Sequence, residues 1–273
     1  MRRWLGGFLM CLAGPLLAAE WTLVTQNFPP FSYPQGAGVV AANAPMAKAG
    51  GPFAEIIELA CKRLGHQCQL QVLPWRRALD LAETGKVDGA FALLGTPERE
   101  RYFRLTRVLV VTRYSFFTLP GKTFDYRQPA DLKGMHVGVY GPSGTSLTLE
   151  ALLQRAAAGT LELETDNPRV LRKLLAGRYG EHGAAFMNYD VARHLQRDLA
   201  LPALREAGTA QVIAYGIGLS RTRVSEADFQ AFDNMLGELQ RDGSLAQILR
   251  RHRLQAAPEV GQPIAAEPGV SGS

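Results

Sequence analysis

The sequence has few cysteines and no histidine pattern typical of a metal site. Only three of its 273 residues are cysteines, and its five histidines never occur at a short ligand spacing such as His-x-x-x-His. Each histidine is explained as an ordinary surface or core residue. We therefore expect no bound metal and no other cofactor.

An excess of one charge is also missing, and so are long apolar runs in the body of the chain. Lys and Arg number 30 against 25 Asp and Glu, and the arginines are scattered rather than clustered. A net charge of +5 is too small to indicate a nucleic-acid partner. Beyond residue 19 no apolar run approaches the roughly 18 residues of a membrane-spanning helix, so we expect none.

The first 19 residues have the pattern of a cleaved signal peptide. Arg2 and Arg3 provide the positive start, and residues 5–17 are apolar but too short to span a bilayer comfortably. Leu17-Ala18-Ala19 is a suitable small-residue cleavage site, and Cys11 is poorly placed for lipid attachment. We therefore expect a freely soluble exported protein whose net charge falls from +5 to +3 once Arg2 and Arg3 are removed.

Export leaves two cysteines, Cys61 and Cys68. In an oxidising compartment such a pair is more often bridged than free. Cys61 is expected near the end of a helix and Cys68 near the start of the next strand, with Gly65 turning the chain between them. We therefore expect a Cys61–Cys68 disulfide.

Strand and helix signals alternate along two stretches, from Trp21 to Leu119 and from Met135 to about Leu204. Such alternation predicts two doubly wound lobes, each with a mainly parallel sheet. A strand near residues 212–219 and two final helices are too few for a third domain, so we expect the chain to return to the first lobe. The expected fold class is α/β, with two lobes joined by a two-segment hinge around a cleft.

The expected division of the chain follows from these crossings, placed near residues 122–129 and 209–215. It assigns residues 1–19 to the signal peptide, 20–121 plus 216–254 to lobe I, 122–215 to lobe II with the hinge segments, and 255–273 to a disordered tail. The tail is rich in Pro, Ala, Gly and Ser with little apolar bulk. Residues 35–51 lack periodicity and are expected to form a surface loop.

The stretch Gly85–Arg101 carries the strongest functional signal. Gly89 to Leu94 is almost wholly apolar, which suits a central strand covered on both faces. Thr96 and Pro97 then suit the start of a helix. Arg99 lies just past the carboxyl end of this strand, where open α/β sheets bind ligands. The plain alternative for Arg99 is a surface ion pair with an adjacent glutamate.

Four short motifs occur in order along the chain. They are Phe28-Pro-Pro-Phe31, Cys61-Lys-Arg-Leu-Gly-His-Gln-Cys68, Gly85-Lys-Val-Asp-Gly through Thr96-Pro-Glu-Arg99, and Asp131-Leu-Lys-Gly-Met-His-Val-Gly138. Together they resemble the bacterial extracellular solute-binding proteins of family 3, the polar amino acid class, over residues 21–254. The resemblance implies a type II periplasmic binding fold and a monomeric periplasmic protein. Such a protein captures a small molecule between its lobes and delivers it to an inner-membrane ABC transporter permease.

The resemblance also implies roles for particular residues. Arg99 would hold a ligand carboxylate through its planar fork, and residues 143–146 would add backbone N–H groups at a helix start. Phe28 and Trp75 would pack on the rest of the ligand. The plain alternatives are a helix-entry turn for residues 143–146 and core packing for the two aromatic residues. The expected ligand-binding residues are Phe28, Trp75, Leu94, Thr96, Arg99, Ser143, Thr145, Ser146, Asn188 and Asp190.

The sequence departs from the family's pattern in two places. Family members carry serine or threonine before the arginine, whereas residues 92–95 are Ala-Leu-Leu-Gly, leaving only backbone carbonyls and Thr96 as acceptors. The family's second-lobe aspartate, which pairs with the ligand's ammonium group, falls at Asn188, with Asp190 two residues on. The carboxylate half of an amino acid site is therefore expected, and the ammonium half stays open. The ligand is an amino acid held differently, or an organic acid without an amine.

Two other functions stay open at this point. An enzyme on the same fold, resembling the cyclohexadienyl or arogenate dehydratases, would need an acid or base in the cleft. Its candidates, Glu98 and Asp190, are both readily explained as surface residues. A ligand-sensing partner of a membrane receptor would use the same cleft and dock on the receptor. We expect a binding protein without catalytic residues.

Overall fold

The structure is a computed structural model that describes residues 19–36, 46–157 and 159–258. The predicted signal peptide, apart from its last residue, and most of the predicted tail lie outside the described residues. Within these ranges no helix combines the length and apolar character needed to cross a bilayer. The same ranges hold no group of three or more His, Cys, Asp or Glu side chains placed to bind a metal ion.

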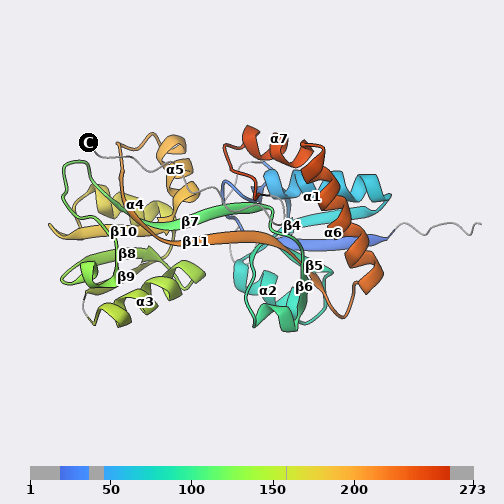
Figure 1. Ribbon diagram of the computed structural model, residues 1–273, viewed down its shortest axis with the longest axis horizontal. Coiled ribbons are helices and arrows are strands. Elements are labelled where there is room, and N and C mark those ends of the chain that lie inside the picture. Colours follow the sequence, from blue (N-terminus) through green and yellow to red (C-terminus); the bar gives the residue numbers. More distant parts are fainter. Residues whose placement is uncertain (1–18, 37–45, 158, 259–273) are drawn as a thin grey trace, which may run out of the picture.

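The described chain forms two α/β halves joined by two long strands (Figure 1). The first half contains β1 (Glu20–Thr25), β2 (Tyr33–Pro34), β3 (Ala47–Gly50), α1 (Pro52–Leu64), β4 (Gln67–Val72), α2 (Trp75–Glu83), β5 (Gly89–Leu94), the 3-10 helix η1 (Arg99–Arg101), β6 (Phe103–Leu105), α6 (Glu226–Arg241) and α7 (Ser244–Arg251). The second contains η2 (Pro129–Leu132), β8 (His136–Tyr140), α3 (Gly144–Ala156), β9 (Thr160–Glu164), α4 (Asn167–Leu175), β10 (Gly183–Asn188) and α5 (Tyr189–Asp198). The joining strands are β7 (Val110–Thr118) and β11 (Arg205–Ser220).

The strands hydrogen-bond in the order β2-β3-β4-β1-β5-β11-β7-β10-β8-β9, with β6 on β11. Within each half the core pairs are parallel, β4-β1-β5 in one and β10-β8-β9 in the other. The joining strands pair antiparallel with each other and with their neighbours β5 and β10. The α/β class with two doubly wound lobes and two connecting segments is therefore confirmed, and the exact lobe boundaries stay a prediction.

Helix α1 shows how the sequence sets the elements of the first half. Pro52 occupies its first position, where a missing N–H costs nothing, and Gly65 ends it in the left-handed region at φ 72°. Phe53, Ile56 and Ile57 are fully buried, and α1 packs against β4 and α6. The predicted disulfide is present and ties Cys61 at the end of α1 to Cys68 in β4.

The structure corrects two expectations. The helix expected after Thr96 is only the single turn η1, because the chain turns at once into β6. The surface loop expected over residues 35–51 contains β3, which pairs antiparallel with β4 through backbone groups and therefore needs no alternating side-chain pattern. Part of that loop, residues 37–45, lies outside the described residues.

The chain remains attached to the first half beyond the last helix. Ala256 bridges to Val110, and the N–H of Ala257 donates to the Leu109 carbonyl at 3.0 Å. The side chain of Gln240 donates to the Ala257 carbonyl at 3.0 Å. The beginning of the predicted tail is therefore fastened to β7, whereas residues from 259 onward lie outside the described residues.

Replacing both disulfide cysteines by serine should lower the stability of the mature protein without changing its fold. The chain-entropy model gives about 2.5 kcal/mol for a loop this short. For a protein of this size that corresponds to a fall in Tm of about 5–10 °C, measured by calorimetry. Reduced wild-type protein is the matched control and should have the same Tm as the double variant. A double variant with the same Tm as the oxidised wild type would contradict a stabilising disulfide.

Candidate functional site

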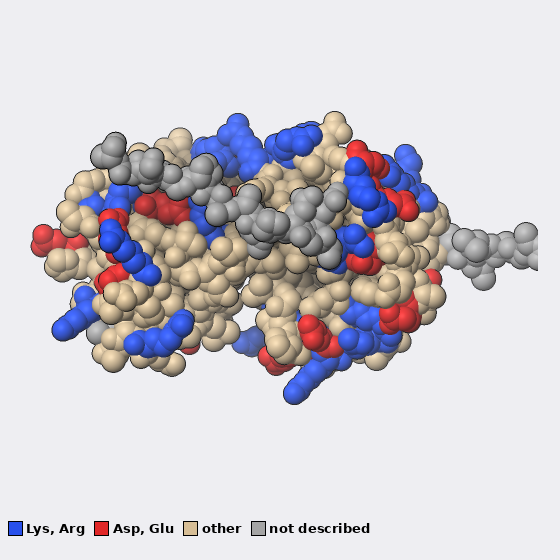
Figure 2. Space-filling model, viewed as in Figure 1, with Lys and Arg blue, Asp and Glu red and all other residues tan. Residues whose placement is uncertain are grey.

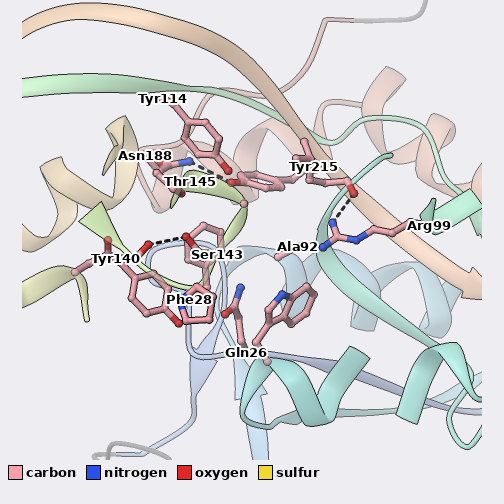
Figure 3. Close-up of a pocket in the computed structure, with 15 residues that line it drawn as sticks. Gln26, Phe28, Ala92, Arg99, Tyr114, Tyr140, Ser143, Thr145, Asn188 and Tyr215 are labelled. Carbon is pink, nitrogen blue, oxygen red and sulfur yellow. Dashed lines mark hydrogen bonds between the residues drawn. The ribbon is translucent and has the colours of Figure 1, made fainter. Parts of the chain in front are cut away.

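A cavity of about 80 Å³ lies where the two halves meet (Figure 3). This volume is several times what one water molecule requires, so the cavity accepts a small solute. It is lined by Gln26, Phe28, Trp75, Ala92, Leu94, Arg99, Tyr114, Tyr140, Pro142, Ser143, Gly144, Thr145, Asn167, Asn188 and Tyr215. These residues come from both halves and from both joining strands, so the cavity is shaped by how the halves approach each other.

Arg99 is half-buried and is held from two sides. Its Nη1 donates to the Leu94 carbonyl at 2.6 Å, and its backbone N–H donates to Thr96 Oγ1 at 3.3 Å. Its guanidinium lies 5.7 Å from the ring centroid of Trp75, within cation–π range. Thr96 therefore fixes the turn that carries Arg99 and does not line the cavity.

The charge of Arg99 has no direct counter-charge in the described part of the chain. Burial lowers its pKa, and the fields of Glu83, Tyr114, Tyr215 and Glu98 raise it by smaller amounts. Among the described residues no carboxylate lies within ion-pair distance of it. The surface ion pair considered from the sequence is therefore wrong. A guanidinium stays charged in proteins, so this half-buried cation attracts an anion.

Strand β5 reaches the cavity through an irregularity at Ala92. Ala92 has φ 55°, in the left-handed region, and the pairing with β11 shifts register at Gly216 and Ile217. A non-glycine residue in this conformation costs about 1–2 kcal/mol. Strained backbone of this kind is concentrated at binding sites. The sequence carried no signal for it, because neither glycine nor asparagine marks the position.

The second half contributes the start of α3. Ser143 Oγ accepts from the N–H of Ser146 at 3.2 Å and donates to the Tyr140 carbonyl at 2.7 Å, while Ser146 Oγ accepts from the N–H of Ser143 at 2.9 Å. This capping box uses both hydroxyls and leaves Ser146 buried outside the cavity. Gly144 and Thr145 line the cavity, and first-turn N–H groups have no acceptor within a helix. The arrangement favours an anion.

Asn188 joins β10 to α5 and faces the cavity from the second half. Its Oδ1 accepts from the N–H groups of Asp190 at 2.9 Å and Val191 at 3.2 Å, capping α5. Its Nδ2 donates to the Tyr215 hydroxyl at 3.4 Å. Asp190 does not line the cavity. Burial raises the pKa of that carboxyl, and a hydrogen bond from Thr112 opposes the rise.

Aromatic rings form most of the remaining wall. Phe28 lies edge-on to Tyr215, with ring centroids 5.7 Å apart. Burial raises the pKa of Tyr215 well above its usual value, so its hydroxyl stays neutral. Tyr114 on β7, Tyr140 and Trp75 complete the aromatic lining.

The structure brings seven of the ten expected residues together. Those lining the cavity are Phe28, Trp75, Leu94, Arg99, Ser143, Thr145 and Asn188, and those outside it are Thr96, Ser146 and Asp190. Gly144 belongs to the expected helix start at residues 143–146, whereas Gln26, Ala92, Tyr114, Tyr140, Pro142, Asn167 and Tyr215 were not expected. Tyr114 and Tyr215 were missed because the sequence placed strands there without showing which side chains would face the cleft. Among these described lining residues Arg99 has the one acidic or basic side chain, and the lining contains no Asp, Glu, Lys or His.

The fold is similar to those of solved binding proteins and of a sensor domain. The amino acid ABC transporter substrate-binding protein AbpA of Streptococcus pneumoniae, solved with L-arginine, has a TM-score of 0.68 at 18% identity, covering 86% of this chain and 94% of that one. An arginine transport periplasmic binding protein of Legionella pneumophila has a TM-score of 0.65 at 17% identity, and the match covers 86% of this chain and 100% of that one. A histidine kinase sensor domain similar to periplasmic binding proteins has a TM-score of 0.70 at 17% identity, and the match covers 88% of this chain and 99% of that one.

These likenesses establish the type II periplasmic binding fold. No curated protein matches the sequence at a significant level. Residues 22–255, however, match the family described as bacterial extracellular solute-binding proteins, family 3. That match spans most of the 273 residues and includes both halves and both joining strands. The chain therefore belongs to the bacterial extracellular solute-binding proteins of family 3.

Proposed function

We propose that this protein binds a small carboxylate-bearing solute between its two lobes in the periplasm and, as a monomer, delivers it to an ABC transporter permease. The observation that carries the proposal is Arg99, a half-buried cation without a carboxylate partner among the described residues, in a cavity that both halves line. A guanidinium fork matches a carboxylate through two parallel hydrogen bonds. The N-terminus of α3 faces the same space from the other half and adds to the attraction.

The proposed ligand-binding residues are those of the expected set that line the cavity. Arg99 binds the carboxylate, Ser143 and Thr145 position the start of α3 against it, and Phe28, Trp75, Leu94 and Asn188 enclose the remainder. A ligand that contacts both lobes does so fully only when they are closed, so its binding favours closure.

Delivery to a transporter is supported by the family and by related structures. Two of the similar solved proteins are named as transport-system binding proteins, one for amino acids and one for arginine. An enzymatic function is less well supported, because an acid or base must reach the reacting atoms. Neither of the candidates, Glu98 and Asp190, lines the cavity.

Replacing Arg99 should weaken binding of a carboxylate strongly. The probe is the acid that gives the largest thermal shift in a screen of amino acids and small organic acids. Loss of the partner of a buried charge costs at least about 2 kcal/mol, so Arg99→Gln should weaken calorimetric affinity by about 30-fold or more. Arg99→Lys, which retains the charge without the fork, should lose less.

The matched control is Arg101→Gln, because Arg101 is exposed and lies two residues beyond Arg99 on the same short helix. This variant should bind the probe as the wild type does. Equal affinity for the wild type and Arg99→Gln would reject the proposed anchor.

Ligand binding should also close the two halves. Because the cavity draws side chains from both halves, a saturating probe should reduce the radius of gyration measured by X-ray scattering in solution. The same concentration of probe should leave Arg99→Gln at the value of the unliganded protein. A radius of gyration that does not change at saturation would exclude closure as the consequence of binding.

A further inference from the structure

Two of the polar features around the cavity are hydrogen-bond donors only. Arg99 donates only, and the start of α3 adds the N–H groups of Gly144 and Thr145. The Ser143 hydroxyl already donates to the Tyr140 carbonyl and accepts from the Ser146 N–H. A cavity of this kind suits a ligand that offers acceptors, such as carboxylate, carbonyl or ether oxygens.

Asn188 adds a further donor, and its orientation is fixed by the helix that it caps. Two backbone N–H groups, those of Asp190 and Val191, donate to Oδ1 at 2.9 and 3.2 Å. Turning the amide over would set its NH₂ group against these backbone donors, which the fold does not allow without losing the cap. The side chain is 3% exposed, so Nδ2 is the group that it presents toward Tyr215 and the cavity.

The acceptors that remain in the lining are neutral. They are backbone carbonyls, the amide oxygens of Gln26 and Asn167, and the hydroxyls of Tyr114, Tyr140, Thr145 and Tyr215. A carboxylate is the strongest partner for an ammonium group taken out of water, whereas neutral dipoles and aromatic faces offset only part of its lost hydration. Among the described lining residues there is no Asp or Glu.

The carboxylates on neighbouring elements face other partners. Glu206 on β11 accepts from Arg113 at 2.9 and 3.1 Å and from Ser115 at 2.7 Å. Asp190 is half-buried, and Thr112 hydrogen-bonds to its carboxyl. Neither side chain lines the cavity, so neither is placed to receive an ammonium group from a ligand on Arg99.

We propose that the solute is a carboxylic acid without an α-ammonium group, its carboxylate on Arg99 and its remaining oxygens or carbons against Asn188 and the aromatic wall. The proposal rests on the function proposed above and narrows its ligand class. Amino acids are disfavoured because no carboxylate among the described lining residues offsets the charge of their ammonium group. The apolar part of the acid packs on the rings of Phe28, Trp75 and Tyr215.

Matched pairs of ligands test this proposal by calorimetry on the mature protein. Each pair consists of an L-amino acid and the acid that lacks its amine: alanine and propionate, leucine and 4-methylpentanoate, phenylalanine and 3-phenylpropionate. In the best-binding pair the wild type should prefer the acid by about 10-fold or more, the scale that one unpaired buried polar group produces. Arg99→Gln should weaken both members of the pair.

A charge placed at residue 188 should reverse the preference. Asn188→Asp retains a good helix-capping side chain and turns the donor at Nδ2 into a carboxylate oxygen. It should bind the amino acid about 10-fold or more tightly than the wild type does and bind the acid less tightly. Asn188→Ser is the matched control, because serine also caps helices and adds no charge. It should keep the preference for the acid.

The outcomes separate this proposal from the one on which it rests. Wild-type protein that prefers the amino acids, with binding lost in Arg99→Gln, overturns the ligand class and leaves the proposed function standing. Two results would overturn the proposed function and this proposal with it. One is an affinity that is the same for the wild type and Arg99→Gln, and the other is no binding of either member of any pair at millimolar concentration. A folded Asn188→Asp variant that still prefers the acid also overturns the role given to Asn188.

Discussion

The pairing of β7 with β11 is the constraint on which the rest of the molecule depends. The two strands run side by side from the Arg205–Thr118 pair to the Tyr215–Val110 pair, and they carry the chain between the halves (Figure 1). They place Tyr114 and Tyr215 in the lining of the cavity, and they pair directly with β5 and β10, whose last residues Leu94 and Asn188 also line it. Two register shifts, at Glu206/Gly208 and Thr209/Gln211, interrupt their ladder near the second half. Bulges of this kind bend a strand and increase its local twist, so the ladder turns most sharply where it enters the second half.

Charge is distributed differently on the outside and in the cavity. Basic and acidic side chains are interspersed over the face shown in Figure 2. Many surface charges form local pairs, such as Arg63 with Asp242 and Arg104 with Glu226. Exposed pairs of this kind contribute little to stability. In the cavity Arg99 stands apart from any carboxylate of the described residues, among aromatic rings. Because it is half-buried and not paired with a carboxylate, this single charge matters more for recognition than the paired charges outside.

Much of the fold followed from the sequence, because its signals are local. The apolar run Gly89–Leu94 located β5, the alternation of signals located the two lobes, and Gly65 marked the turn that ends α1. Short edge strands escaped detection because backbone pairing alone creates them, as at β3. The candidate site was harder to predict because it depends on which side chains of distant elements face one another. Arg99 could be placed from the strand that precedes it, but the left-handed Ala92 and the two tyrosines of β7 and β11 depend on a register that no local pattern encodes.

Leu94 has a consequence for the thermodynamics of recognition. Its carbonyl holds one N–H of Arg99 at 2.6 Å while the Trp75 ring lies 5.7 Å from the guanidinium. The guanidinium is thus preorganised before any solute arrives, with its other donors free of a carboxylate partner among the described residues. Ordering a long side chain during association costs about 0.5–1.5 kcal/mol. Here that ordering has already taken place during folding, at a backbone carbonyl that no change of side chain at residue 94 would remove.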